Sequence, residues 1–142
     1  MIRIQLIREQ LSEYTNFVNT HDDAFKHLSP ILSFEDREVF GILMLDTKSN
    51  ILGWNQVSVG IIDQTFVSAR EVFKAPILAN SNRIILAHNH PSGDPTPSSA
   101  DHEITRKMCE VGELLGIEVL DHIIIGAGGH KWVSLKNIGA MS

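Results

Sequence analysis

The feature that most limits how this chain can fold is a nearly uninterrupted apolar run at residues 39–45, VFGILML. A strand with one face in water alternates apolar and polar residues, whereas this run is apolar at successive positions. Such a strand has to be covered on both faces, as in proteins whose helices pack on both sides of a sheet. We therefore predict a central strand over residues 37–46 within one α/β domain, for which 142 residues are enough.

Strand-like and helix-like patterns alternate along the rest of the chain. Alternating or continuous apolar residues predict strands at residues 1–8, 51–59, 84–87, 117–125 and 131–135. Apolar spacing and capping residues predict helices at residues 20–28, 68–80 and 99–115. Because proline removes a helical hydrogen bond, the first helix should end before Pro30, and the second should kink or end early at Pro76. The expected architecture is a mixed, curved sheet flanked by helices.

Composition and charge exclude several classes of protein. The formal net charge is −5 and no basic block is present, so binding to a nucleic acid backbone gains nothing from composition. The single cysteine, Cys109, excludes an internal disulfide and is typical of a reducing compartment. Arg3, Arg8 and Glu9 interrupt any signal-peptide core, and no apolar run approaches the roughly 20 residues that span a bilayer. We expect a cytoplasmic protein without a membrane partner.

The segment with the clearest chemistry is IILAHNHPSGDPTPSSAD, at residues 84–101. Side chains alternate between the faces of a strand, so His88 and His90 should share a face with the apolar residues Ile84 and Leu86. Prolines then make a stiff loop, and the aspartate that ends the segment lies one turn into a helix, beside its apolar stripe. Two imidazoles and a carboxylate are the three protein ligands of a catalytic zinc site, whose fourth position holds water.

Purely structural roles would account for part of this segment. Ser98 and Asp101 have the spacing of a capping box, in which each side chain bonds the backbone of the other. A lone histidine at a strand end is usually structural. The capping box leaves His88 and His90 without a role, so the spacing favours a metal centre.

The segment HNHPSGDPTPSSAD resembles the JAMM (MPN+) metalloprotease motif, in the form found in bacterial RadC-like proteins. That motif is His-x-His-Pro, then ten residues after the second histidine, then Asp, and it falls on His88, His90 and Asp101. The resemblance covers residues 34–138 and includes LDHIIIG near the end. It implies a JAMM/MPN architecture, similar in outline to the cytidine deaminases, with Zn²⁺ bound by these three residues.

The resemblance also implies a zinc-dependent metallopeptidase or isopeptidase that acts on a peptide or protein substrate. In JAMM proteases a glutamate at the start of an early strand is the general base, and Glu38 matches it. Ser98 matches the residue that hydrogen-bonds the oxyanion. From the residues alone, Glu38 could equally be the solvated end of a buried strand, with Glu35 and Glu71 as alternative bases in a loop and on a helix face.

A second hypothesis is a non-catalytic or accessory module in DNA repair or DNA metabolism, as the RadC name suggests. Full-length RadC-like proteins carry a helix-hairpin-helix region before the catalytic domain, and this chain is expected to be too short to include one. Residues 1–33 are expected to form an N-terminal strand and short helix, and residues 34–142 the catalytic domain. A zinc deaminase requires a Pro-Cys-x-x-Cys motif, which one cysteine cannot supply.

The remaining candidates fit non-catalytic roles better. Asp94 is interpreted as a turn residue, with an orienting role in the loop or a hydrogen bond to a ligand as the alternative. His122 is interpreted as a satisfied strand histidine, with a contact to a zinc ligand as the alternative. Cys109 is expected to be a small core or surface residue. The other histidines are expected at the surface: His21, His27, His102 and His130.

Overall fold

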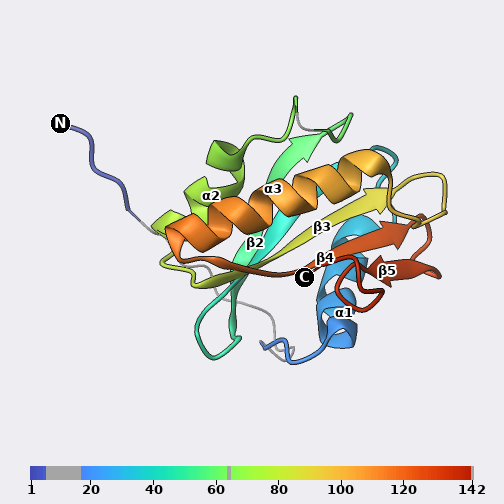
Figure 1. Cartoon of the computed structure of the whole chain (residues 1–142), viewed down its shortest axis with the longest axis horizontal. Helices are drawn as coiled ribbons and strands as arrows, with labels where there is room; N and C mark the ends of the chain where they lie inside the picture. The colour runs from blue at the N-terminus through green and yellow to red at the C-terminus, as the bar shows by residue number, and fades with distance from the viewer. Residues whose placement is uncertain (6–16, 64, 142) are drawn as a thin grey trace.

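The structure is a computed structural model that describes residues 1–5, 17–63 and 65–141. These residues form a five-stranded sheet in the order β2-β1-β3-β4-β5, in which β3 and β4 are parallel and the other neighbours antiparallel (Figure 1). The predicted mixed α/β architecture is confirmed. The strands are β1 (Val39–Leu45), β2 (Ile51–Val59), β3 (Arg83–His90), β4 (Glu118–Gly126) and β5 (Trp132–Ser134). The helices are α1 (His21–Leu32), α2 (Ala69–Leu78) and α3 (Ser99–Leu115).

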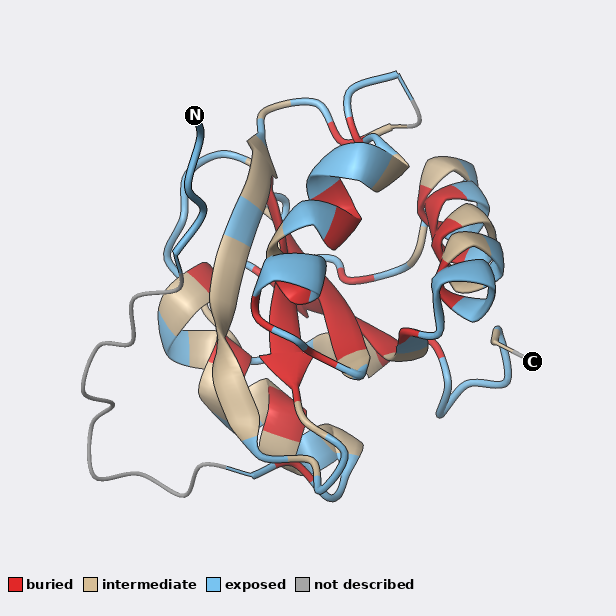
Figure 2. Ribbon diagram, turned by 90° about the vertical axis from the view of Figure 1, so that its left-hand side faces the viewer, coloured by how far each residue is buried: buried red, intermediate tan, exposed pale blue. Residues whose placement is uncertain are grey.

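Helices cover both faces of the sheet, and each interface has its own apolar core. Helices α2 and α3 lie over one face and α1 over the other (Figure 1). Phe40 of β1 packs in the first core with Met108 of α3, whereas Leu43 of β1 packs in the second with Leu28 of α1. All residues of β1 are buried, and Figure 2 shows the buried strands between the helices. The prediction of a strand covered on both faces is therefore confirmed.

The predicted end of the first helix is wrong, because α1 continues through Pro30 to Leu32. Proline in a helix costs about 3 kcal/mol or more, since its ring and missing N–H disturb the preceding turn. Leu28 and Leu32 are fully buried beneath the sheet, and each such side chain stabilises the fold by about 1.5–3 kcal/mol. Packing therefore outweighs the local preference. Helix α2 likewise continues past its proline, Pro76, and ends at Leu78, just short of the predicted limit at residue 80.

The edge strand predicted for residues 1–8 is wrong for residues 1–5, which have no regular structure, and residues 6–8 lie outside the described residues. Ile2 and Ile4 are exposed, so their alternation with polar residues does not reflect pairing with a sheet. The division of the chain at residue 33 stays a prediction. No helix in the described part of the chain is long and apolar enough to cross a membrane.

Candidate metal centre

The end of β3 and the start of α3 lie together at one end of the sheet (Figure 1). Ile84 and Leu86 of β3 pack with Ile104 of α3 in one core. His88 and His90 follow on the same face because strand side chains alternate, and both imidazoles reach the first turn of α3. The predicted facing of the two histidines is confirmed.

The capping box and the ligand set turn out to share one carboxylate. The Ser98 hydroxyl accepts a hydrogen bond from the Asp101 amide at 3.1 Å, and Oδ2 of Asp101 accepts one from the Ser98 amide at 2.8 Å. This reciprocal pair starts α3 and holds the carboxylate in place. Asp101 is buried, as its position beside the apolar stripe predicts. Capping thus orients the carboxylate that the two histidines contact.

The three side chains form a small triangle of ligand atoms. Nε2 of His88 lies 3.0 Å from Nε2 of His90 and 3.1 Å from Oδ1 of Asp101. Nε2 of His90 lies 3.2 Å from Oδ2 of Asp101. Zinc bonds of 2.0–2.2 Å in a tetrahedron separate the ligand atoms by about 3.3 Å. The triangle therefore has the size that a tetrahedral metal ion requires, and these residues could hold one.

The charge on Asp101 also suits a cation. Burial opposes ionisation of this carboxyl, but the hydrogen bonds from His88 and His90 outweigh it and lower its pKa far below the ordinary value. The hydrogen bond to Asp101 likewise raises the pKa of His90 against the opposing effect of burial, with the Glu38 charge adding a smaller effect. The centre therefore has an ionised carboxylate that stabilises a positive charge beside it. Either a proton on an imidazole or a metal ion can supply that charge.

The hydrogen bonds of His90 direct its free electron pair to the centre of the triangle. Its Nδ1 lies 2.8 Å from the backbone carbonyl oxygen of Asp94, which can only accept, so Nδ1 carries the hydrogen. In the neutral ring Nε2 is then unprotonated and faces Asp101. This is the tautomer that binds a metal through Nε2, and the carbonyl partner is typical of metal-binding histidines.

Glu38 immediately precedes β1, near the end where Phe40 pairs with His88. It is half-buried, and its negative charge contributes to the raised pKa of His90, so its carboxylate lies within electrostatic range of that imidazole. The alternative bases lie elsewhere in the fold. Glu35 is exposed in the loop before β1, and Glu71 forms an exposed ion pair with Lys74 on α2.

The family model described as "RadC-like JAB domain" matches residues 18–140. The chain belongs to the RadC-like JAB domain family. The predicted family is confirmed. This RadC-like domain is 46% identical over 124 residues to a "UPF0758 protein" of Desulfitobacterium hafniense strain DSM 10664 / DCB-2, covering 87% of this chain and 54% of that protein.

Other relatives give the same picture. A "UPF0758 protein" of Moorella thermoacetica is 52% identical over 105 residues, which are 74% of this chain and 45% of the relative. The "UPF0758 protein Mbar_A2303" of Methanosarcina barkeri is 48% identical over 117 residues, or 82% and 50% of the two chains. The RadC-like chain spans about half the length of the curated relatives it matches.

Asn89, between the two histidines, holds the segment around Glu38 and is a residue that sequence reasoning missed. Its Oδ1 accepts a hydrogen bond from the Val39 amide at 2.7 Å, and its Nδ2 donates to the Arg37 carbonyl at 2.8 Å. A longer bond of 3.4 Å reaches the Glu35 carbonyl. Backbone pairing of β1 and β3 ends at Phe40 and His88, so this side chain continues the contact past the last pair.

The preferred interpretation of His122 as an ordinary strand histidine is incomplete, because its imidazole contacts a proposed ligand directly. Nε2 of His122 lies 2.8 Å from Nδ1 of His88, and its Nδ1 lies 2.6 Å from the Thr105 hydroxyl. Burial, followed by the neighbouring charge of His88, lowers the pKa of His122 well below its ordinary value, so the ring is neutral. Thr105 was not predicted at all.

The other candidates are placed largely as predicted. The Asp94 carboxylate bonds Thr96 within its turn, and the contact with His90 comes from its backbone instead. His102 and His130 are exposed. His21 and His27 were predicted at the surface but are half-buried. The His21 ring lies against Trp132, with ring centroids 5.7 Å apart.

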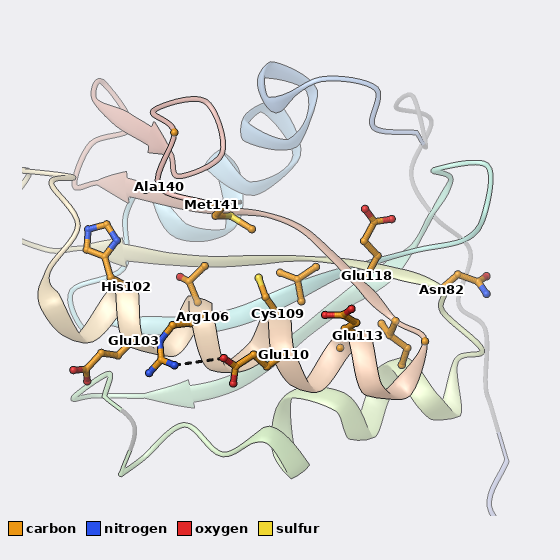
Figure 3. Close-up of a pocket in the computed structure, with 16 residues that line it drawn as sticks. Asn82, His102, Glu103, Arg106, Cys109, Glu110, Glu113, Glu118, Ala140 and Met141 are labelled. Atoms are coloured by element: carbon orange, nitrogen blue, oxygen red, sulfur yellow. Dashed lines mark hydrogen bonds and ion pairs between the residues drawn. The ribbon is translucent and has the colours of Figure 1, made fainter.

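A cavity beside α3 is separate from the candidate metal centre. A cavity of about 1050 Å³ lies between α3, the start of β4 and residues 139–141, with Cys109 on its wall (Figure 3). Its exposed rim carries Glu113 and Glu118 and an Arg106–Glu110 ion pair of 3.4 Å. None of the three triangle residues lines it. In this RadC-like domain the metal-ligand triangle lies instead where β3, the loop and α3 meet.

Proposed function

We propose that this RadC-like domain is a zinc-dependent hydrolase of amide bonds, a metallopeptidase or isopeptidase. The observation that carries the proposal is the triangle of His88, His90 and Asp101 ligand atoms, 3.0–3.2 Å apart. The charge of Glu38 acts on His90 from the adjoining start of β1. Two neutral imidazoles and one carboxylate leave a zinc ion with net positive charge and one open position. A set of three protein ligands with an adjacent carboxylate is typical of hydrolytic zinc centres.

The residues divide the chemistry between them. Zinc, when bound by the triangle, supplies positive charge that polarises a substrate carbonyl and acidifies a water molecule. Glu38 accepts a proton from the attacking water and later donates it to the leaving amine. One carboxylate can serve both steps because it is left protonated by the first.

Ser98 is proposed to stabilise the oxyanion. Its hydroxyl oxygen already accepts the cap bond from Asp101, and its hydrogen is not used in that bond. Ser98 is exposed at the rim of the triangle, where a substrate carbonyl can approach it. An oxyanion donor contributes roughly 2.7–4 kcal/mol to catalysis, whereas an N-cap contributes about 1 kcal/mol to stability. A Ser98→Ala variant should therefore lose activity more than stability.

The proposed substrate is a peptide or protein in the cytoplasm. His88 is fully buried, while the His90 side chain keeps 13% of its surface exposed, so the triangle is open on the His90 side. Through that opening an extended substrate peptide can reach the triangle without passing through an enclosed cavity. No observation favours the accessory role in DNA metabolism, and the net charge of −5 gives no support for phosphate contacts.

The test compares the wild type with Glu38→Gln, using Glu35→Gln as a matched control in the same segment. Zinc content is measured by mass spectrometry, and hydrolysis with pooled internally quenched peptide libraries and an isopeptide-linked probe. We expect one zinc per chain in all three proteins and loss of hydrolysis in E38Q alone. Absence of zinc from the wild type, or equal hydrolysis by E38Q, would overturn the proposal. A salt-dependent DNA-binding assay tests the accessory role in parallel.

A further inference from the structure

A continuous line of buried hydrogen bonds runs behind the metal-ligand triangle. It begins at the Asp101 backbone carbonyl, which lies 2.7 Å from the Thr105 hydroxyl. The same hydroxyl lies 2.6 Å from Nδ1 of His122, and Nε2 of His122 lies 2.8 Å from Nδ1 of His88. The line therefore leaves one proposed ligand, on α3, crosses to β4, and returns to another on β3.

The direction of every bond in this line follows from its first acceptor. A carbonyl oxygen only accepts, so the Thr105 hydroxyl donates its one hydrogen to Asp101. The Thr105 oxygen must then accept from His122, whose Nδ1 therefore carries a hydrogen. A neutral imidazole has one N–H, so Nε2 of His122 accepts from the Nδ1–H of His88. In the neutral ring Nε2 of His88 is then unprotonated and faces the triangle.

We propose that His122 and Thr105 are positioning residues that set the tautomer and ring orientation of His88 for zinc. The proposal rests on the proposed function, since it concerns the affinity of the same centre for its metal. Partners that fix the second nitrogen of a metal-binding histidine orient the ring and raise its basicity. Here the partner is a second imidazole, that of His122. Its Nε2 accepts from His88 only because its Nδ1–H is donated to the Thr105 oxygen.

The two histidines of the triangle are thus oriented by different means. His90 donates its Nδ1–H to a backbone carbonyl in the loop, and no substitution can remove that acceptor. His88 depends on side chains from two other elements, and both can be changed. Among the described residues every buried side-chain nitrogen and oxygen has a partner, so a change in this line leaves a defined group unpaired.

Thr105→Val is the sharpest perturbation because it keeps the shape of the side chain and removes its hydroxyl. Without that acceptor, the hydrogen on His122 can move to Nε2 and be donated to Nδ1 of His88. The hydrogen of His88 then lies on Nε2, where zinc has to displace it. We expect zinc affinity to fall about 10–100-fold, the usual effect of losing such a partner. Thr47→Val, at an exposed turn position, is the matched control.

His122 provides a second pair of variants. His122→Phe removes the acceptor for the Nδ1–H of His88, and we expect the same loss of about 10–100-fold. In His122→Gln the amide oxygen can accept that hydrogen, so its affinity should lie closer to that of the wild type. Far-UV circular dichroism confirms that each variant is folded before its affinity is measured.

The experiment measures zinc affinity of the full chain by competition with a chelator, together with ¹⁵N-resolved imidazole spectra of the zinc-loaded wild type. We expect His122 to carry its hydrogen on Nδ1 alone. Wild-type affinity in both T105V and H122F, or a hydrogen on Nε2 of His122, would overturn the positioning role and leave the proposed function intact. Failure of the wild type to bind zinc would overturn both.

Discussion

Replacing Asn89 by alanine tests whether one side chain joins the histidine strand to the segment that carries Glu38. The variant removes the bond to the Val39 amide at 2.7 Å and the bond to the Arg37 carbonyl at 2.8 Å. Val39 is buried, so its N–H is left without a partner at a cost of about 1–3 kcal/mol. Arg37 is exposed, and water can replace the lost donor there, so the second bond adds about 0.5–1 kcal/mol.

The expected loss of unfolding free energy is therefore about 1.5–4 kcal/mol, a large share of the roughly 5–15 kcal/mol of an ordinary domain. Urea denaturation in the presence of a chelator measures it without a contribution from metal. With a urea slope of about 2 kcal/mol per molar, the midpoint should fall by about 1–2 M. Asn50→Ala is the control, because that side chain makes an exposed bond of 3.1 Å to Asp46 and should change stability by less than about 0.5 kcal/mol.

The same variant tests the position of Glu38 independently of zinc binding. Asn89 touches neither Nε2 atom of the triangle, so folded N89A should keep most of its zinc affinity while Glu38 loses its fixed position. Hydrolysis should fall more than zinc binding. If N89A matches N50A in its urea midpoint and keeps full hydrolysis, the side chain does not support Glu38 and the reasoning is refuted.

Two further perturbations probe the surroundings of the triangle. In Gly126→Ala the new Cβ would lie 2.2 Å from the Gly93 carbonyl oxygen in the loop after β3, whereas in the control Gly53→Ala it meets Met44 at an ordinary 3.5 Å. We expect G126A to lose about 1–3 kcal/mol and also zinc affinity; equal urea midpoints for the two variants would contradict this. In the metal-free chain the hydrogen bonds to Asp101 outweigh its burial and lower its pKa. The ionised carboxylate therefore stabilises the fold fully above the unfolded pKa of about 3.9, and this stabilisation is lost as the pH falls through the lower folded pKa. The urea midpoint should therefore decline below about pH 4 in the wild type and less in Asp101→Asn, and parallel pH profiles would refute the assignment.

Local periodicity predicts much of the candidate metal centre because its three proposed ligands lie on two short elements. The period of two in β3 places His88 and His90 on one face. The helical period of α3 places Asp101 beside the buried stripe, and the capping box starts the helix at the right residue. Each of these relations spans a few residues, so the sequence contains the information directly.

The supporting residues could not be found in this way because they depend on contacts between distant segments. His122 reaches His88 because Leu86 pairs with His122 across the parallel β3–β4 ladder. The register of that parallel pairing cannot be predicted from the sequence of either strand alone. Thr105 lies one turn beyond Asp101 on the same helix face, but its bond to His122 needs that register too. The end of α1 was wrongly predicted before Pro30 for the same reason, because the burial of Leu32 beneath the sheet is a tertiary effect.

The tripeptide His88-Asn89-His90 therefore serves two sides of the sheet at once. Alternation directs the two imidazoles to the α3 side, where Asp101 completes the triangle. It directs the residue between them away from that side, and Asn89 there bonds the backbone on both sides of Glu38. Any shift of β3 that moved the ligands would also move the support of the proposed base. The spacing between the triangle and the proposed base is then a property of one strand, which is why an amide at this central position suits the site better than an apolar residue.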